Sequence, residues 1–561
     1  LYGADYMKHY SSRRSELRLH RWSYVICFLS MLSLCVIRHS LAFLIAWEIM
    51  ALSSFFLIIF ESWKEDVIKA GTNFFIQSHV SVVLLTIGFI VMAQKTGSYD
   101  FSAIAGYHGA GLGWPFALIL AGFAVKAGFV PFHTWLPRAH PAAPAHISGV
   151  MSGVIIKIGI YGILRMVTLF NCDMLLTGYI ILAAAAVSGL YGVMLAIVQH
   201  NLKKLLAYHS IENIGIIGMG IGIGCIGLGL GNQPLAALGF GGALLHTLNH
   251  ALFKSSLFFT AGSVYQAAHT LDVERLGGLA KSLPLTAAFF LTASVAICGL
   301  PPMNGFISEL MIYMGMFDWM QLSGTAGVMG AAFAITALVM IGGLAILCFT
   351  KAFGIVFLGT SRTDLPQMKE FGAMRTAPLA IMAVIMLSVG IFPQVYTSVI
   401  SNVLSGFGIS QAVETPEWMS KVGMASLALT GVVIVLLLLR KMATRRASKR
   451  VGETWGCGYT AATPKIQYTA TSFVRTYASL FTGLLGFSTH KPKVEKVFPE
   501  VDGYESENYD KLERNLIERP LDGYRRFMDK FSFLQNGRLQ YYILYGILCI
   551  VVAVALTFIF A

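Results

Sequence analysis

Apolar runs of about 20 residues recur along almost the whole chain, and they limit its fold more than any other feature. A helix of about 20 residues spans the roughly 30 Å hydrocarbon core of a membrane. The chain has 561 residues, of which 56% are hydrophobic and 12% charged, a composition outside the range of soluble globular domains. Only helices can satisfy their own backbones in so many spans. The sequence therefore predicts an all-α polytopic membrane protein.

About thirteen transmembrane helices are visible in the hydropathy pattern. Their predicted ranges are residues 22–37, 39–61, 73–94, 115–137, 144–171, 174–199, 205–227, 236–267, 283–318, 327–358, 376–407, 423–441 and 541–561. The chain then divides into a cytoplasmic N-terminal segment, two five-helix units, two further transmembrane helices, a second cytoplasmic segment and a C-terminal transmembrane helix. These parts cover residues 1–21, 22–171, 174–358, 376–441, 442–539 and 541–561, respectively.

Prolines interrupt one span in each five-helix unit, and a buried charge lies beside each interruption. They are Pro131, Pro137, Pro141 and Pro144 around Lys126, and Pro301 and Pro302 before Glu309. Broken helices at membrane depth are tolerated where they line a cavity. Since each unit has an odd number of spans, the second must enter the membrane from the opposite side. This pattern predicts two inverted five-helix repeats with proline-broken helices.

Basic residues are distributed unevenly between the two sides of the predicted topology. One side carries most of the lysines and arginines of the connections, whereas the other carries only Arg38, Lys95 and Lys421. Because basic loops stay in the cytoplasm, the basic side is cytoplasmic and the C-terminus lies outside. The net charge of +13 is thus mostly a topology signal, and no nucleic-acid partner is expected.

Several ionisable side chains lie within the spans, where each costs about 2.5–3.5 kcal/mol to insert, so each is a candidate functional residue. They are Glu48, Lys126, Lys157, His246, His250, Lys254 and Glu309, and His133 lies in the proline-rich stretch after Lys126. We interpret that stretch, VKAGFVPFHTWLPRAHPAAPAH, as a broken helix whose lysine and histidines line a hydrated proton path.

His246, His250 and Lys254 recur at every fourth residue and fall on one face of a helix. Neighbours in such a row are about 6 Å apart along the axis, a gap that water can bridge, and histidine exchanges protons near neutral pH. One interpretation is therefore a proton relay. The other is a buried polar stripe that joins helices through hydrogen bonds.

Glu48 and Lys126 also admit two interpretations: a fixed ion pair that locks two helices, or a pair that opens and closes. Two charges about 4 Å apart attract by about 4 kcal/mol at an effective dielectric constant near 20. Desolvation of a buried lysine opposes this attraction, with a free-energy cost of similar size. Withdrawal of Glu48 would then expel the proton from Lys126.

The eight cysteines are scattered, and no CxxC pair occurs. This pattern argues against disulfides, a zinc site or an iron–sulfur cluster on this chain. We expect no catalytic residue, bound cofactor or metal here.

Several stretches resemble the antiporter-like subunits shared by respiratory complex I, multi-subunit sodium/proton (Mrp) antiporters and membrane-bound hydrogenases. Within residues 47–310 they are WE at 47–48, KAGFVPFHTWLPRAHPAAPAHISGVMSGVIIKIGIYGILR, NLKKLLAYHSIENIG, LLHTLNHALFKSSLFFTAG, GGLAKSLPLTAAFF and LPPMNGF. The resemblance implies a pair in the first half-channel, a central relay residue, a continuing hydrophilic axis and an exit residue. These are, in order, Glu48 with Lys126, then Lys157, then His246, His250 and Lys254, and finally Glu309. The distal complex I subunit usually has lysine at that last position, so the effect of an acid there is open.

The stretches HISGVMSGVIIK and TWGCGYTAATPKIQYTATSF look most like the branch of hydrogenase-4 component B and formate hydrogenlyase subunit 3. This implies a proton-translocating subunit of a group 4 membrane-bound hydrogenase in a bacterial or archaeal cytoplasmic (inner) membrane. A NiFe centre and iron–sulfur clusters would then lie in a soluble partner module, reached through other membrane subunits. The alternatives are a subunit of a sodium/proton antiporter, a subunit of NADH:quinone oxidoreductase (complex I), and a static scaffold that pumps nothing.

The resemblance also bears on the two ends of the chain. Larger members have further helices before residue 22, so about sixteen are expected in full members, with the N-terminus outside. Relatives carry a lateral bracing helix near the second cytoplasmic segment. There, apolar residues at roughly helical spacing predict an amphipathic helix at the membrane surface, the alternative being a charged linker. They are Leu512, Leu516, Tyr524, Phe527, Phe531 and Leu534.

Overall fold

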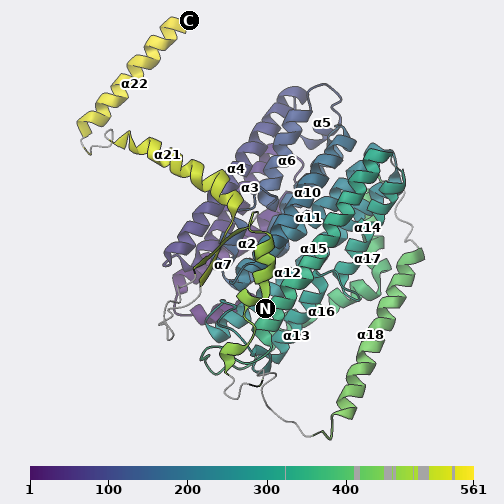
Figure 1. The fold of residues 1–561 in the computed structure, drawn as a ribbon. Helices are drawn as coiled ribbons and strands as arrows, with labels where there is room; N and C mark the ends of the chain where they lie inside the picture. The colour runs from purple at the N-terminus through teal and green to yellow at the C-terminus, as the bar shows by residue number, and fades with distance from the viewer. Residues whose placement is uncertain are drawn as a thin grey trace. The chain divides into compact units, whose positions relative to one another are not determined.

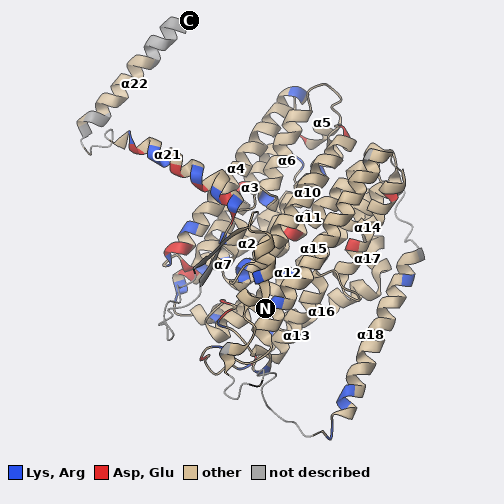
Figure 2. Cartoon of the chain, in the orientation of Figure 1, with Lys and Arg blue, Asp and Glu red and all other residues tan. Residues whose placement is uncertain are grey.

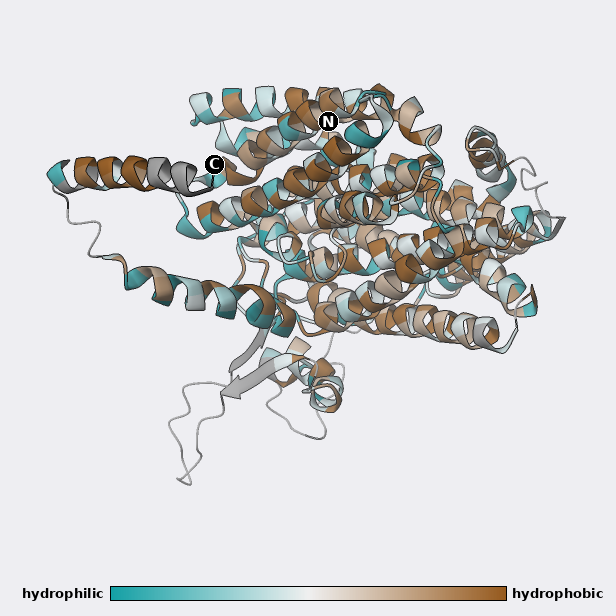
Figure 3. Ribbon diagram, turned by 90° about the horizontal axis from the view of Figure 1, so that it is seen from above, coloured by the Kyte–Doolittle hydropathy of each residue, from teal (hydrophilic) through white to brown (hydrophobic). Residues whose placement is uncertain are grey.

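The structure is a computed structural model, and it describes the chain except for residues 323, 410–416, 448–457, 459–462, 484, 491–504, 533–536, 538 and 561. The chain forms two compact units, Leu1–Leu480 and Phe481–Ala561. Helices make up nearly all of the larger unit (Figure 1). Hydrophobic residues cover most of their length (Figure 3), and few charged residues interrupt them (Figure 2).

The first part of the larger unit contains one broken span. Its helices are α1 (Tyr2–Tyr6), α2 (Arg14–Val36), α3 (Ser40–Ile58), α4 (Glu65–Thr96), α5 (Phe101–Ala105), α6 (Gly113–Ala127), α7 (Leu136–Ala142), α8 (Ala145–Val150), the π turn η3 (Met151–Ile155) and α9 (Ile156–Leu169). The break separates α6 from α7, and α8, η3 and α9 follow one another as a single span.

The second part contains another break, between α13 and α14. Its helices are α10 (Met174–Ile197), α11 (Leu202–Gly229), α12 (Gln233–Ala268), α13 (Pro284–Ile297), α14 (Asn304–Leu322), α15 (Thr325–Phe357), α16 (Ala373–Ile391), α17 (Pro393–Ser405), α18 (Glu417–Ala443) and α19 (Ala470–Leu480). Nine helices within the described residues are long and apolar enough to cross a membrane. Shorter apolar helices include α6 and α13.

The predicted all-α polytopic membrane fold with proline-broken helices is confirmed. Two predicted spans, 283–318 and 376–407, each consist of two helices, because prolines at 301–302 and at 393 interrupt the backbone ladder. The first spanning helix, α2, begins at Arg14, earlier than the predicted residue 22, because its hydrogen bonding continues through polar residues that hydropathy does not detect.

Glycines allow the central helices to pack closely. A Cβ at Gly215 of α11 would lie 2.5 Å from the backbone nitrogen of Gly189 in α10, so only glycine fits there. Helix α12 packs against α11 and α14, and it also contacts α8, η3 and α13. The same helix therefore touches the elements next to both breaks.

The N-terminal segment is docked on the second part of the unit. The Tyr2 hydroxyl donates to the Phe259 carbonyl oxygen at 2.5 Å, and Arg375 Nε donates to Asp5 Oδ2 at 2.7 Å. The Arg375 guanidinium also donates to Gln266 Oε1 at 2.5 Å. Helix α19 is docked in a similar way, because the Glu274 carboxylate accepts from the backbone N–H groups at its N-terminus.

The smaller unit contains the only β-ladder of the described residues, in which β1 (Gly486–His490) pairs antiparallel with β2 (Glu505–Tyr509). It continues through α20 (Lys511–Glu513), the π turn η6 (Arg514–Glu518), α21 (Arg519–Asp529) and α22 (Leu539–Phe560). Helical backbone thus covers much of the stretch with the predicted amphipathic pattern, and α21 carries charges of both signs (Figure 2). Leu534 lies outside the described residues.

Candidate functional site

Lys126 lies in the last turn of α6, next to the first break. The helix ends because Gly128 adopts a left-handed conformation (φ 85°) and its N–H bonds back to the Ala124 carbonyl oxygen at 2.9 Å. Lys126 is 1% exposed, and its Nζ has no hydrogen-bond partner among the described residues. It lies 4.7 Å from the ring centroid of Phe74. Burying an ammonium group without an acceptor is costly, which marks Lys126 as a candidate functional position.

Glu48 makes no direct ion-pair contact with Lys126 among the described residues, although its charge acts on Lys126 electrostatically. Its Oε1 instead lies 2.7 Å from Nε2 of His79 on α4. The other ring nitrogen of His79, Nδ1, lies 2.9 Å from the Phe75 carbonyl oxygen, which only an N–H can satisfy. With Nδ1 protonated, the Nε2–Oε1 contact needs a second proton, on the imidazole or on the carboxyl group. His79 and Glu48 therefore share a proton in this geometry.

Lys157 lies in the first turn of α9, just after the π turn, within the span formed by α8, η3 and α9. Its Nζ donates to the Ser152 carbonyl oxygen and to Nδ1 of His250 on α12. Single π turns occur frequently at functional sites, and this one brings the backbone at Ser152 within reach of Lys157. Two residues predicted from separate parts of the sequence are thus in contact. The remaining ring nitrogen of His250, Nε2, is buried without a partner among the described residues.

His246 forms the centre of a hydrogen-bonded cluster between three helices. Its Nε2 lies 3.1 Å from Asn213 Oδ1 on α11, and its Nδ1 lies 2.9 Å from Ser308 Oγ on α14. Ser308 Oγ also accepts from Asn249 Nδ2 at 2.9 Å. A ring held between two polar partners can exchange a proton at one nitrogen while the other stays bonded.

Lys254 completes the predicted row on α12. Its Nζ donates to the Leu206 carbonyl oxygen on α11 and lies 5.6 Å from the ring centroid of Phe258. His246, His250 and Lys254 are all fully buried, so the structure places the predicted face of α12 inside the protein. The three residues face different partners, and no direct hydrogen bond joins one to the next among the described contacts.

Glu309 lies in the second turn of α14, directly after the second break. The break brings Gly299 against its side chain, so that a Cβ at Gly299 would lie 2.5 Å from Glu309 Oε2. Gly299 also has a φ of 62°, which disfavours other residues. The second break thus holds space for a buried carboxyl group.

His133 lies between α6 and α7 and is fully buried. Its ring stands edge-on to Tyr191 of α10, with 5.7 Å between the ring centroids. The structure therefore connects this part of the first break to α10.

Sequence reasoning missed His79 and a polar group within α11. That group consists of His209, Glu212 and Asn213, in the motif AYHSIENIG of an otherwise apolar helix. The signal was present, since an ionisable residue within a span is a candidate by the same argument that selected Lys126.

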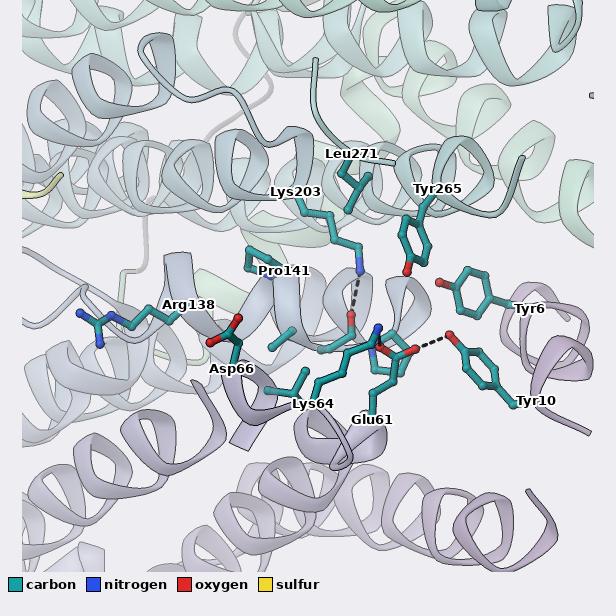
Figure 4. A pocket seen from close by; sticks show the side chains of 14 residues that line it. Tyr6, Tyr10, Glu61, Lys64, Asp66, Arg138, Pro141, Lys203, Tyr265 and Leu271 are labelled. Carbon is teal, nitrogen blue, oxygen red and sulfur yellow. Dashed lines mark hydrogen bonds and ion pairs between the residues drawn. The ribbon is translucent and has the colours of Figure 1, made fainter. Parts of the chain in front are cut away.

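An open cavity of about 260 Å³ lies beside the junction of α7 and α8 (Figure 4). Lys203 points into it, and its Nζ donates to the Ala143 carbonyl oxygen at 2.7 Å. On the opposite wall, Glu61 accepts from the Tyr10 hydroxyl at 2.6 Å and pairs with Lys64 at 2.5 Å. Burial, followed by the hydrogen bond to Glu61, raises the pKa of Tyr10. The cavity thus brings solvent close to a buried lysine.

Within the described residues, no group of three or more His, Cys, Asp or Glu side chains is arranged to hold a metal ion. The titratable residues of the site are instead spread along α3, α6, α9, α12 and α14.

Comparisons with known proteins show the family of the chain. Residues 38–336 match the family model described as NADH:quinone oxidoreductase/Mrp antiporter, TM. Hydrogenase-4 component B of Escherichia coli (strain K12) is 35% identical over 82% of this chain and 70% of its own length. Formate hydrogenlyase subunit 3 of the same organism is 33% identical over 82% of this chain and 74% of its own length.

A solved structure shares the fold. It is a chain of the membrane-bound sulfane sulfur reductase, an archaeal respiratory membrane complex, with a TM-score of 0.68, 21% identity and coverage of 94% of this chain and 83% of that chain. The predicted resemblance is confirmed by the family match and by these relatives. The chain is an antiporter-like membrane subunit that belongs to the NADH:quinone oxidoreductase/Mrp antiporter family.

Proposed function

We propose that this chain translocates protons as a membrane subunit of a group 4 membrane-bound hydrogenase of the formate hydrogenlyase or hydrogenase-4 type. Partner subunits would hold the NiFe centre and the iron–sulfur clusters and carry out the redox chemistry. Each proton moved across 100 mV costs about 2.3 kcal/mol, which that chemistry must supply. The names of the two E. coli relatives support this assignment.

A series of titratable side chains, most of them buried, carries the proposal. It begins with the proton shared by Glu48 and His79, and it includes the unpartnered Lys126 and the contact between Lys157 and His250. On α12 it continues to Lys254, and it ends at Glu309 in the second break. Lysine and histidine exchange protons, whereas Na⁺ prefers oxygen ligands, so the composition of the series favours H⁺.

The distribution of basic residues supports a cytoplasmic location for the open cavity. Under the topology that this distribution predicts, residues 62–72 and 200–204 are cytoplasmic connections and the C-terminus lies outside. We assign the intake of protons to this cavity, because it gives water access to Lys203 at the beginning of α11. The helical stretch 511–529 would brace neighbouring subunits along the membrane surface.

Mass spectrometry with metal analysis tests the assignment, on the complex purified gently through this chain. Nickel and iron with hydrogenase-like subunits are expected. A flavin and an NADH module would assign the chain to complex I instead. An isolated chain without redox subunits would leave the sodium/proton antiporter as the better assignment.

Transport by the reconstituted complex tests the path itself. Lys126→Ala should abolish proton movement while the complex still assembles. Unchanged proton movement in this variant would support a static scaffold and contradict the proposal.

A further inference from the structure

A buried histidine and a buried carboxylate contact each other within α11. His209 and Glu212 have side chains that are 0% and 1% exposed, and Nδ1 of His209 bonds to Oε2 of Glu212. Asn213 Nδ2 donates to the same carboxylate oxygen at 3.2 Å and to the His209 carbonyl oxygen at 2.8 Å. The pair is thus enclosed and oriented by its own helix, and the ring of Phe349 on α15 covers His209 at 4.6 Å.

The hydrogen bonds leave two atoms of the pair available for a proton. Oε2 of Glu212 already receives two N–H groups, whereas Oε1 of Glu212 and Nε2 of His209 are buried and make no hydrogen bond within the usual distances among the described residues. The thiol of Cys348 on α15 lies near enough to His209 to interact with its ring. With one proton between Nδ1 and Oε2, the pair has a charge of −1. A second proton at Nε2 or Oε1 makes it neutral without breaking either hydrogen bond. The geometry therefore suits a group that stores and releases one proton.

Asn213 links this pair to the row on α12. Because its Nδ2 points at two acceptors, its Oδ1 must face Nε2 of His246, at 3.1 Å, and that nitrogen must carry hydrogen. Nδ1 of His246 then faces Ser308 Oγ, whose single hydroxyl hydrogen can point either to the ring or to the Gly305 carbonyl oxygen, 3.0 Å away. The protonation state of the pair thus acts on His246 through one oriented amide.

Charged and titratable groups surround the pair on three helices. Those that interact electrostatically with His209 or Glu212 are Lys254 on α12, Glu309 on α14, and Cys348 and Lys351 on α15, together with Cys298 directly after α13. Lys254 approaches α11 closely, since its Nζ donates to the Leu206 carbonyl oxygen. The pair therefore lies within the electrostatic reach of both the last lysine of the row and the acid of the second break.

We infer that His209 and Glu212 store one proton between Lys254 and Glu309, and that Glu212 is a further residue of the transport path. This inference rests on the proposed function. Proton arrival changes the charge of the pair from −1 to 0, which removes the attraction for the Lys254 ammonium and the repulsion of the Glu309 carboxylate. Departure of the proton restores both. No bond between heavy atoms changes, and no electron is transferred.

The test compares variants of the intact complex reconstituted in vesicles. Glu212→Gln keeps the shape and can still bond to His209, but it cannot take up a proton. We expect proton transport per turnover to fall by roughly tenfold or more in this variant, and Glu212→Asp to retain part of it. Thr260→Val is a matched control, because Thr260 is equally buried and bonds only to carbonyl groups of its own helix.

Infrared difference spectra between two pH values give a second readout, which a merely structural pair would not produce. A carboxyl C=O stretching band for a proton on Oε1, or an imidazolium band for a proton on Nε2, should appear at the lower pH and be lost in Glu212→Gln. Normal transport by Glu212→Gln beside inactive Lys126→Ala would overturn the inference and leave the proposed function standing. Normal transport by both variants would overturn the inference and the proposed function together. A band that persists in Glu212→Gln would also overturn the inference.

Discussion

Nζ of Lys157, in the span after the first break, donates to Nδ1 of His250 on α12. The contact joins the two parts of the larger unit at a pair of titratable groups. Lys157→Met keeps the length of the side chain and removes the ammonium, so proton transport should fall by roughly tenfold or more. Vesicle acidification under turnover measures this loss. The complex should still assemble, and equal transport by the variant and the parent would contradict the role of Lys157.

The Glu48–His79 contact predicts that substitutions at these two positions are not additive. Each single variant, Glu48→Gln or His79→Phe, should reduce transport, because each removes the shared proton. The double variant should be little worse than either, since residues that share one interaction couple. A double-mutant cycle on transport rates measures the coupling. Losses that multiply would show that the two residues act independently.

Gly299→Ala should disturb the second break without removing any titratable group. The new Cβ would lie 2.5 Å from Glu309 Oε2, and the backbone has a φ of 62°, so the carboxyl group must move. We expect reduced transport in an assembled complex. Gly342→Ala on α15 is the control, because a Cβ there meets nothing within 4 Å. Equal transport by both variants would mean that the position of Glu309 is unimportant.

Lys351 stabilises the C-terminal end of α10. Its buried Nζ donates to the carbonyl oxygens of Ile197 at 2.5 Å and Gln199 at 2.8 Å, where a helix end favours a cation. Lys351→Met should lower the free energy of unfolding by about 2 kcal/mol, as for hydrogen bonds from a charged group. Thermal unfolding of the purified chain measures the change. An unaltered midpoint would exclude this capping role.

The docking of the N-terminal segment should depend on pH. A hydrogen bond from Lys8, with a second from Arg375, lowers the pKa of Asp5 below its usual 3.8. Its stabilising contribution is therefore fully present above about pH 3.8 and is lost as the pH falls through the lowered pKa. Asp5→Asn should reproduce the acid state at neutral pH. The hydrogen-exchange rate of the backbone amides of residues 2–10 should then increase. An unchanged exchange rate in this variant would show that other contacts hold the segment.

The sequence predicted the features that depend on hydrophobic periodicity and on the free-energy cost of burying a charged group. Apolar runs predicted the spans, prolines predicted the breaks, and the price of burying charge selected Lys126, Lys157 and Glu309. Pairing was not predictable in this way. Glu48 bonds to His79, because the partner of a side chain depends on how neighbouring helices are rotated, which hydropathy does not specify. The π turn before Lys157 was likewise not predictable, because no residue type in the sequence specifies it.

Helix α12 has 36 residues and is therefore about 54 Å long. It contacts α8 and η3 near one break and α13 and α14 near the other. Its contacts with α14 include Gly242 and Asn249, and its contacts with η3 and α8 include Ala251 and Gly262. The two sets are adjacent on one continuous helix, so a shift of α12 that repacks one set also moves the residues that form the other.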